Sequence, residues 1–445
     1  MERTLRVSTS APELPVICVL VLNYNGLRHL EPCFSSLQQL EYPADKLELV
    51  LVDNNSSDGS VEFMRTRFPG VKIVHHPQNY GFSKGNNLGA EQARGQLVAF
   101  LNNDMRVDRR WLIELAQPLL RDPDIICAGS KILSWNGKYI DFAGSAANVL
   151  GHGFQEGWGE PPEAFGEEKL ILAPCGGAML MDRQVFIDCG GFDEDYFAFY
   201  EDLDLGWRLW VLGYKVAYAP RAITYHVHHG WWGKAPNAKV SVLYQRNAFC
   251  TLFKNYDDEN LSRILPVALM LYLRRAYLAA DVNVAAWRSE PAEVAPHLHA
   301  ESPHAKPPVY GGAYYLREVW RTLRGEGIGG LCRKVAAEIG RRRRVLLSRR
   351  PPAPSRHARQ AARPGYVFAD RRAASHLVAA DDIVCGLDHL MEKRQAVQSR
   401  RRRSDKEILS MLRKPFLRDD PNPHYIQTME ELVAACGLRN LFEPE

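Results

Sequence analysis

Long apolar segments and paired cysteines are both missing from this sequence. The 445 residues include no run of about 18 apolar residues, so no membrane-spanning helix is predicted. The first segment, MERTLRVSTSAPELP, lacks the apolar core of a signal peptide, which argues against export. The nine cysteines are scattered without a C-x-x-C pair. They therefore indicate neither a disulfide framework nor a zinc site, and reduced thiols in the cytosol are expected.

Two further absences limit the possible functions. The sequence has no internal repeat and no glycine-rich triphosphate loop of the P-loop type. The missing loop argues against a nucleotidyltransferase, which would consume a nucleoside triphosphate. The composition, 46% hydrophobic and 24% charged, is that of a globular chain of two or three domains.

Charge is divided unevenly along the chain. Residues 1–260 carry 24 Lys and Arg against 32 Asp and Glu, whereas residues 261–445 carry 32 against 20, so the two parts have net charges of about −8 and +12. The basic part suggests attraction to an anionic surface, either phospholipid headgroups or nucleic acid. Its densest charge lies in Arg341–Arg344, Arg349, Arg350 and Arg400–Arg403. Because these runs lack interleaved aromatic residues, nucleic acid is not expected, which leaves an anionic membrane surface or a plain solvated charge run.

Four short apolar runs alternate with helical segments in the first hundred residues. The runs are Val16–Leu22, Leu47–Val52, Val71–Val74 and Leu97–Leu101. This alternation predicts an α/β fold with a doubly wound, mostly parallel sheet and right-handed crossovers. Further elements predicted along this part are a helix over 111–121, loops and short strands over 127–166, a strand over 178–181 and a helix over 200–212.

The character of the chain changes beyond about residue 255. A helix is predicted near 261–280, a linker at 291–308, Arg-rich helical sequence at 313–346 and shorter helices near 376–399, 405–413 and 428–442. Residues 348–366 are too rich in Pro and Arg to pack, and we expect a linker there. The predicted organisation is a tail at 1–14, an α/β domain at 15–255 and a basic helical extension at 256–445.

The stretch LVAFLNNDMRVD, residues 97–108, is the centre of the functional prediction. A buried strand ends there in Asn102, Asn103 and Asp104. In an open parallel sheet, ligands bind outside the carboxyl ends of the strands, where Asp104 could meet a diphosphate and its hard cation. The hypothesis is a metal-assisted nucleotide-sugar site. The alternative is that the three residues are ordinary turn formers.

Asp53 follows the second apolar run in the same manner. Its carboxylate could accept a hydrogen bond from N3–H of uracil or thymine and so select a pyrimidine nucleotide. A simple turn residue is the alternative.

Several motifs occur in an order that is informative together. They are VLNYNG, VDNNSSDGS, NYGFSKGNNLGA, LNNDMRV, GGAML, GGFDEDYFAFYEDLDLGWRL and YHVHHG. Over about residues 15–232 the chain resembles the family 2 inverting glycosyltransferases, which have the GT-A fold, and within them the bacterial rhamnosyltransferase-like branch. The resemblance implies transfer of a sugar from a nucleotide diphosphate donor to an acceptor hydroxyl, with inversion at the anomeric carbon and usually with Mg²⁺ or Mn²⁺.

The resemblance also implies roles for individual residues of the donor site. The positions that match those lining the base and ribose are Asn23, Asn25 and Asp53, and those that match the loop approaching the ribose and diphosphate are Lys84, Asn86 and Asn87. Asn102, Asn103 and Asp104 match the family's Asp-x-Asp, but Asn102 replaces its first acid and brings no charge. Asp104 would then be the main metal ligand of this motif.

His226 stands where the family often supplies a histidine ligand. A mixed set of oxygen and nitrogen ligands from Asp104 and His226 favours Mn²⁺ over Mg²⁺. The alternative for His226 is a buried, hydrogen-bonded histidine beside His228 and His229.

Inversion in one displacement needs a carboxylate that removes the acceptor proton. The segment YEDLDLGWR offers three acids, of which Asp204 stands one helical turn before Arg208 and is expected to form an ion pair with it. By resemblance the base is Asp202, with Glu201 orienting the acceptor. A helix N-cap is the competing interpretation of Asp202.

Four further residues are candidates for contact with sugars. Gly176 and Gly177 fit a place where the backbone approaches the sugars closely, and a tight turn fits almost as well. Trp231 and Trp232 could stack on an acceptor sugar, or serve as core or membrane-interface residues.

Together these features predict an inverting glycosyltransferase of bacterial surface polysaccharide assembly, with rhamnose as one option for the sugar. Its partners would be a nucleotide-diphosphate sugar, a glycan or lipid-linked acceptor and an anionic membrane surface, and the protein would lie on the cytoplasmic face of the plasma membrane. The alternative, raised by Asn102, is a catalytically silent scaffold that binds nucleotide sugars.

Overall fold

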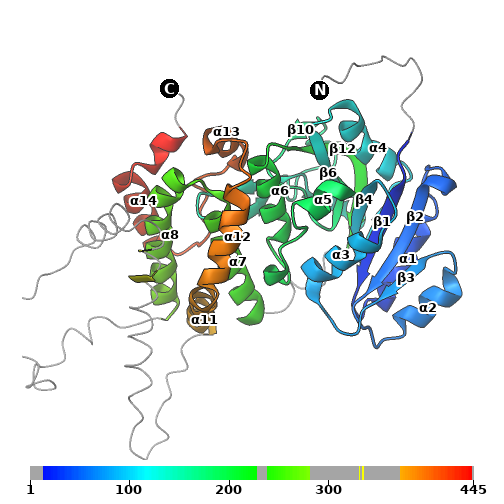
Figure 1. Ribbon diagram of the computed structural model, residues 1–445, viewed down its shortest axis with the longest axis horizontal. Coiled ribbons are helices and arrows are strands. Elements are labelled where there is room, and N and C mark those ends of the chain that lie inside the picture. The colour runs from blue at the N-terminus through cyan, green and yellow to red at the C-terminus, as the bar shows by residue number, and fades with distance from the viewer. Residues whose placement is uncertain (1–13, 228–237, 281–329, 331–332, 335–370, 443–445) are drawn as a thin grey trace, which may run out of the picture. The chain divides into compact units, whose positions relative to one another are not determined.

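The computed structural model describes residues 14–227, 238–280, 330, 333–334 and 371–442 (Figure 1). The chain forms two compact units. The sheet unit takes in the described residues of Met1–Asn237 together with Asn247–Asp257 and Lys393–Leu417, and the helical unit takes in those of Ala238–Arg246, Asp258–Glu392 and Arg418–Glu445. The tail predicted at 1–14 and the linkers predicted at 291–308 and 348–366 lie almost wholly outside the described residues, as does the helical stretch predicted at 313–346.

The sheet unit is built on one mixed sheet with the strand order β10-β12-β6-β11-β4-β1-β2-β3. Of these strands, all but β10 and β11 run in the same direction, so the sheet is mostly parallel, as predicted. The bounds are β1 Ile17–Asn23, β2 Leu47–Asp53, β3 Lys72–His75, β4 Leu97–Asn102, β6 Ile125–Ser134, β10 Lys169–Leu170, β11 Ala178–Asp182 and β12 Lys215–His226. Short strands β5 (Met105–Val107) and β7 (Ile140–Phe142) pair with β12 and β6, and β8 (Ser145–Ala147) pairs with β9 (Gly153–Gln155).

Helices cover both faces of this sheet because its central strands are apolar on both sides. Alternate residues of β1, such as Val19 and Val21, belong to the core cluster that includes residues of α1 (Leu27–Leu37) and α4 (Trp111–Arg121). Leu20 and Leu22 point the other way, toward α3 (Gly81–Gln92). The remaining helices of this part are α2 (Ser60–Arg67), α5 (Arg183–Asp188) and α6 (Glu201–Val211). The doubly wound α/β prediction is therefore confirmed.

The prediction of loops and short strands over 127–166 is wrong for its first part, where the ten-residue strand β6 lies. All ten of its residues are buried between β11 and β12. This strand was not predicted because Gly129, Ser130 and Lys131 interrupt its apolar run. Lys131 is tolerated because its Nζ donates to the carbonyl oxygens of Pro162 and Ala164, at 2.9 and 2.8 Å.

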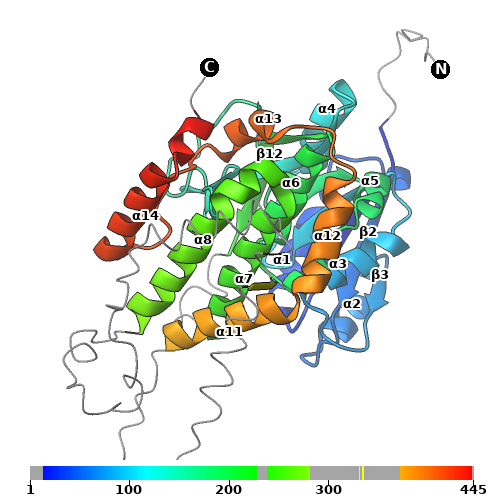
Figure 2. The ribbon, with the colours of Figure 1, turned by 60° about the vertical axis from the view of Figure 1, so that its left-hand side comes forward.

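The helical unit is formed around α8 (Asp258–Ala279), which contacts α11 (Arg371–Cys385) and α14 (Pro423–Ala435) (Figure 2). Arg275 of α8 is buried and forms an ion pair with Asp419, and its guanidinium also donates to Tyr425 Oη at 2.7 Å. Helices α7 (Ala238–Asn255) and α12 (Leu387–Gln398) begin in this unit and end in the sheet unit, and α13 (Asp405–Leu409) belongs to the sheet unit. No helix within the described ranges is both long and apolar enough to cross a membrane.

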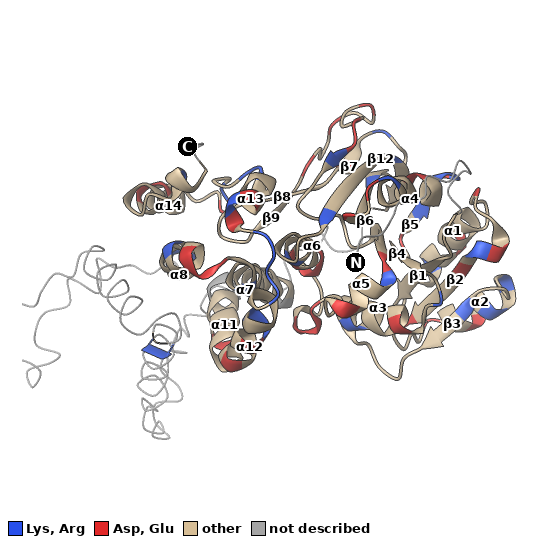
Figure 3. Ribbon diagram, turned by 45° about the horizontal axis from the view of Figure 1, so that its top comes forward, with Lys and Arg blue, Asp and Glu red and all other residues tan. Residues whose placement is uncertain are grey.

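The link between α12 and α13 carries Arg400–Arg403, and Figure 3 marks its basic residues in blue. The Arg403 guanidinium donates to the carbonyl oxygens of Tyr214 and Gly213, at 2.8 and 3.0 Å, just beyond the C-terminus of α6. A cation is favourable at this end of the helix dipole. Arg401 donates to Asp405 and Arg400 to the carbonyl of Asp188. At least three side chains of this run therefore bind groups of the sheet unit itself.

Candidate functional site

The polar residues that end three neighbouring strands meet at one edge of the sheet. Asn23 of β1 is in register with Asp53 of β2, and its Nδ2 donates to Asp53 Oδ1 at 3.2 Å. On its other side, Asn23 Oδ1 accepts from Nδ2 of Asn103 at 2.7 Å. The predicted convergence of these residues at the carboxyl ends of the strands is thus present in the fold.

Asp53 is fully buried and its second oxygen is also engaged. Oδ2 accepts from the Ser56 amide at 3.0 Å and lies 3.0 Å from Nδ1 of His75. Asn25 turns the loop with a φ of 52°, and its Oδ1 accepts from the Ser57 amide at 2.8 Å. The sequence prediction missed His75, whose side chain is half-exposed beside Asp53. Its place at the end of β3, in register with Asp53, is the signal that could have found it.

The three candidates on α3 differ in what they offer to a ligand. Lys84 is exposed, and its Nζ lies 2.9 Å from Glu194 Oε2. Asn86 donates to the carbonyl of Phe82 at 3.1 Å. Asn87 holds the backbone of Phe192 by accepting from its amide at 2.9 Å and donating to its carbonyl at 2.8 Å. The two amides are therefore used within the protein, and Lys84 has the accessible polar group.

Gly176 and Gly177 join the strand edge to α6. The backbone N–H of Asn102 donates to the Gly177 carbonyl at 2.9 Å. A Cβ on Gly177 would lie only 2.4 Å from the side-chain Nδ2 of Asn102. The Gly176 amide donates to Asp202 Oδ2 at 2.8 Å. The glycines are thus explained by close approach of neighbouring side chains to the backbone.

Glu201 and Asp202 form the first residues of α6. Asp202 is not the N-cap, because Tyr200 occupies that position and Asp202 Oδ1 accepts from the adjacent Leu203 amide at 2.7 Å. Burial raises the pKa of Asp202 above 3.8, while hydrogen bonds from the amides of Gly176 and Leu203 oppose the rise. Burial, together with the neighbouring Asp202, raises the pKa of Glu201 well above 4.5. Glu201 Oε2 is buried and has no hydrogen-bond partner among the described residues.

Asp104 and His226 face each other across the turn after β4 and the end of β12. Asp104 Oδ2 lies 3.4 Å from His226 Nε2, and Nδ1 of the same ring lies 2.5 Å from Asp141 Oδ2. Burial lowers the pKa of His226, but the carboxylates of Asp104 and Asp141 outweigh it and raise the pKa to about 9.

These two residues fit a divalent cation. Asp104 Oδ1 is buried and has no hydrogen-bond partner within the described ranges, and Asp141 orients the His226 ring as carboxylates do behind metal-bound histidines. No group of three or more His, Cys, Asp or Glu side chains arranged to hold a metal occurs in the described part of the chain. A cation here would therefore need further ligands from amides or from a bound diphosphate.

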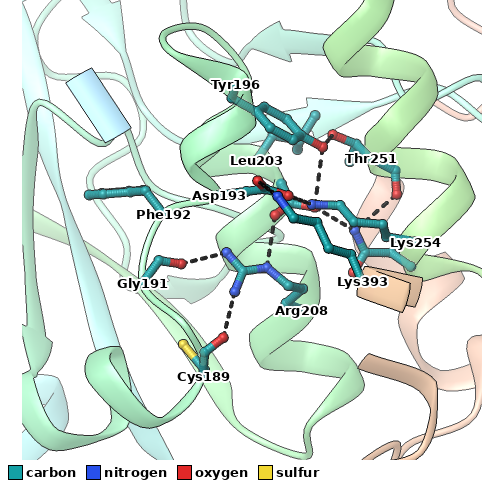
Figure 4. A network of polar contacts seen from close by, with 12 residues as sticks. Cys189, Gly191, Phe192, Asp193, Tyr196, Leu203, Arg208, Thr251, Lys254 and Lys393 are labelled. Carbon is teal, nitrogen blue, oxygen red and sulfur yellow. Dashed lines mark hydrogen bonds and ion pairs between the residues drawn. The ribbon is translucent and has the colours of Figure 1, made fainter. Parts of the chain in front are cut away.

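A buried ionic network lies behind this site (Figure 4). Asp204 and Arg208 form the predicted ion pair at 2.8 Å, and Lys254 of α7 lies 2.9 Å from Asp204. Lys254 also pairs with Asp193, which in turn pairs with Lys393 of α12. Burial would raise the pKa of Asp193, but the two lysines hold it well below its usual range. No local sequence pattern indicated the two lysines, because they come from distant parts of the chain.

The mostly parallel sheet, with helices on both faces and polar residues at its carboxyl edge, makes the sheet unit an open α/β fold. Residues 18–190 match the model of glycosyl transferase family 2, and it is this stretch of the chain that belongs to the family.

Curated relatives match parts of the chain. It is 33% identical over 207 residues to the O-antigen biosynthesis protein RfbC of Myxococcus xanthus, a match over 44% of this chain and 16% of that protein. It is 28% identical over 265 residues to an N-acetylglucosaminyl-diphospho-decaprenol L-rhamnosyltransferase of Mycobacterium tuberculosis, over 52% of this chain and 82% of the relative. The matches to the first relatives span less than two thirds of those proteins, 16% for RfbC and 34% for glycosyltransferase AglE of Haloferax volcanii.

Solved structures resemble the chain more distantly. The crystal structure of GalNAc-T7 with UDP, GalNAc and Mn²⁺ has a TM-score of 0.46 at 20% identity, covering 58% of this chain and 51% of that one. That of Staphylococcus aureus TarS 1–349 in complex with UDP-GlcNAc has a TM-score of 0.42 at 16% identity, covering 83% and 92%.

Proposed function

We propose that the protein transfers a sugar from a nucleotide diphosphate donor to an acceptor hydroxyl, with inversion, in the assembly of a bacterial surface glycan. The observation that carries the proposal is the chain of contacts at the sheet edge. It runs from Asp53 through Asn23 to Asn103, and from the neighbouring Asn102 through the two glycines to Asp202. Residues from four elements thus meet where ligands bind in open α/β sheets.

The donor nucleotide would lie at the Asp53 end of this edge. Asp53 is held rigid by Asn23 and Ser56, and His75 adds a half-exposed ring beside it. Because Asp53 is fully buried, its carboxylate would accept N3–H of a pyrimidine base once nucleotide binding uncovers it. Lys84 is the accessible cation that would approach the diphosphate.

Asp202 is the proposed base. In its ionised form it would remove the proton of the acceptor hydroxyl as the hydroxyl attacks the anomeric carbon from the face opposite the leaving diphosphate. The amides of Gly176 and Leu203 fix both of its oxygens and favour the ionised form. Glu201, buried with one oxygen unpartnered among the described residues, would orient the acceptor.

Asp104 and His226 would hold the divalent cation, Mn²⁺ or Mg²⁺. Bound there, the cation would stabilise the charge that develops on the leaving diphosphate. The protein's own part is to keep the two ligand atoms facing each other, with Asp141 fixing the ring of His226.

The proposed sugar is L-rhamnose and the proposed acceptor a lipid-linked glycan, because the Mycobacterium tuberculosis relative is an L-rhamnosyltransferase that acts on a decaprenol diphosphate sugar, as its name states. The test is a panel of nucleotide sugars with Mn²⁺ or Mg²⁺, with products identified by mass spectrometry. Release of a nucleoside diphosphate and a mass gain of one sugar on the acceptor are expected. Binding of donors without release or transfer would contradict the proposal.

Asn102 supports a second candidate, a catalytically silent protein that binds nucleotide sugars. An amide in place of the first acid of the family motif removes one charge from the metal site, and its side chain packs against Gly177. The same panel separates the two functions, because a silent protein would bind a donor and release nothing.

Membrane association stays a proposal that rests on composition. The run at Arg341–Arg344, with Arg349 and Arg350, lies outside the described residues. We expect the chain to sediment with anionic vesicles more than with neutral ones. Equal binding to both would contradict this expectation.

A further inference from the structure

The segment before α6 has an unfavourable backbone. Phe197 has φ 59° and ψ −56°, and the Ala198 amide donates to the Tyr196 carbonyl at 2.6 Å across it, which makes a γ-turn of the rare positive-φ kind. Phe199 and Tyr200 follow with φ of 72° and 66°. Bulky aromatic residues seldom adopt such angles, so the surrounding structure must hold them there.

One side chain supplies much of that restraint. Asn247 of α7 is fully buried, and its Nδ2 donates to three carbonyl oxygens of the segment, those of Tyr196 at 3.1 Å, Ala198 at 3.0 Å and Phe199 at 2.8 Å. Because an amide nitrogen has two hydrogens, at least one of these bonds is shared between two acceptors. One turn further along α7, Thr251 Oγ1 lies 2.8 Å from Tyr196 Oη, so the same helix holds the segment twice.

The segment also connects the two sides of the proposed site. The Phe197 carbonyl accepts from the amides of Phe82 and Ser83, at 2.7 and 3.3 Å, in the first turn of α3. At its other end, the Tyr200 carbonyl accepts from the Asp204 amide of α6 at 2.9 Å, and the Phe199 amide hydrogen-bonds to the Glu201 carboxylate. The helix with Lys84 and the helix with the proposed base are therefore joined through this backbone.

We propose that Asn247 is a positioning residue, which fixes the strained segment Phe197–Tyr200 and thereby sets the place of Glu201 and Asp202 relative to α3. This inference rests on the proposed function. It follows because a strained segment persists only where other contacts determine it, and Asn247 contacts three of its carbonyl groups directly.

The first test compares Asn247→Asp with the wild type. The new side chain is close in size and leaves no cavity; when ionised it cannot donate, and when protonated it can donate only one bond in place of the three. A small displacement of a catalytic group costs on the order of 100-fold in rate, so kcat should fall about 10- to 100-fold while KM for the donor stays within about twofold. Asn255→Ala is the matched control, because Asn255 is also a buried asparagine of α7 but donates to Asp204 and Thr251 instead. We expect this control to lower Tm while leaving kcat nearly unchanged.

A second pair of variants tests the strain itself. Phe197→Gly and Phe197→Ala both lose the ring, but glycine alone adopts a positive φ without cost. The glycine variant should therefore have a higher Tm than the alanine variant and an equal or lower kcat. Because misfolding would lower Tm, a higher Tm of Phe197→Gly with no higher kcat than Phe197→Ala cannot be explained by misfolding of the glycine variant.

Amide hydrogen exchange over residues 196–203 is measured in every variant. Faster exchange there in Asn247→Asp supports the inference even if no donor is turned over. Wild-type kcat and unchanged exchange in Asn247→Asp, or an equal fall of kcat in Asn255→Ala, would overturn it. A wild-type chain that transfers no sugar contradicts the proposed function instead, and the exchange and Tm comparisons then decide the inference.

Discussion

His226 Nε2 lies 3.4 Å from Asp104 Oδ2, while its other ring nitrogen lies 2.5 Å from Asp141. Carboxylates behind metal-bound histidines are worth about 10- to 100-fold in metal affinity, so Asp141→Asn should weaken Mn²⁺ binding by about this factor. Asp104→Ala should abolish the binding. Titration calorimetry with Mn²⁺ measures both.

The control for this prediction is His389→Ala. His389 is exposed and lies 3.5 Å from Glu392. The variant therefore removes a histidine that lies beside a carboxylate but outside the proposed site. Its Mn²⁺ affinity should equal that of the wild type. Undiminished Mn²⁺ binding by Asp104→Ala would contradict this assignment of the cation.

The buried ion pair of Asp204 and Arg208 predicts a large loss of stability. Asp204→Ala leaves both Arg208 and Lys254 buried with one partner fewer. Breaking a buried pair in this way costs about 3–5 kcal/mol in the free energy of unfolding, which urea titration measures. Glu31→Ala removes the exposed partner of Arg67 and should cost at most about 1 kcal/mol. Similar losses in the two variants would show that the network contributes no more than a surface pair.

The stability of the protein should depend on pH through Asp405. Burial raises the pKa of Asp405 from 3.8 to about 6, with Arg401 opposing the rise. Because the folded-state pKa is the higher one, the contribution of Asp405 is fully present below pH 3.8 and is lost as pH rises through about 6. This pKa shift corresponds to a change of about 3 kcal/mol in the free energy of unfolding. Asp405→Asn should remove this part of the pH dependence in urea titrations between these two pH values. An unchanged pH profile would contradict the assignment.

Much of the fold could be predicted from local patterns. The apolar runs of β1, β2 and β4 each end in a polar residue, and a parallel sheet brings such ends to one edge, so the meeting of Asn23, Asp53 and Asn103 followed from the pattern. The ion pair of Asp204 with Arg208 followed from helical spacing alone.

Contacts between distant parts of the chain could not be predicted in this way. Asn247 reaches a segment about fifty residues away, and Lys393 reaches Asp193 across 200 residues. Strand β6 was missed because a buried lysine is acceptable only when specific carbonyls receive it. The contacts of Arg403 could not be predicted either, because a run of arginines does not reveal that one of them binds carbonyls beyond the C-terminus of α6.

The pKa of Asp202 predicts where activity is lost in acid. A base must be ionised, and burial raises the pKa of this carboxyl above 3.8. As pH falls, kcat/KM should therefore begin to decline at a higher pH than an ordinary aspartate would give. A pH–rate profile of the wild type measures this. A flat profile down to pH 3.8 would argue against Asp202 as the base.

The rate of sugar transfer by Asp202→Asn tests the central claim most directly. The variant keeps an oxygen for the Gly176 or Leu203 amide but cannot take a proton. Asp182→Asn is the matched control, since Asp182 caps α5 by accepting from the Val185 amide at 2.8 Å. We expect kcat to fall about 100- to 10,000-fold in Asp202→Asn, with donor binding and Tm retained, and the control to keep its activity. Normal turnover in a folded Asp202→Asn protein would contradict the claim.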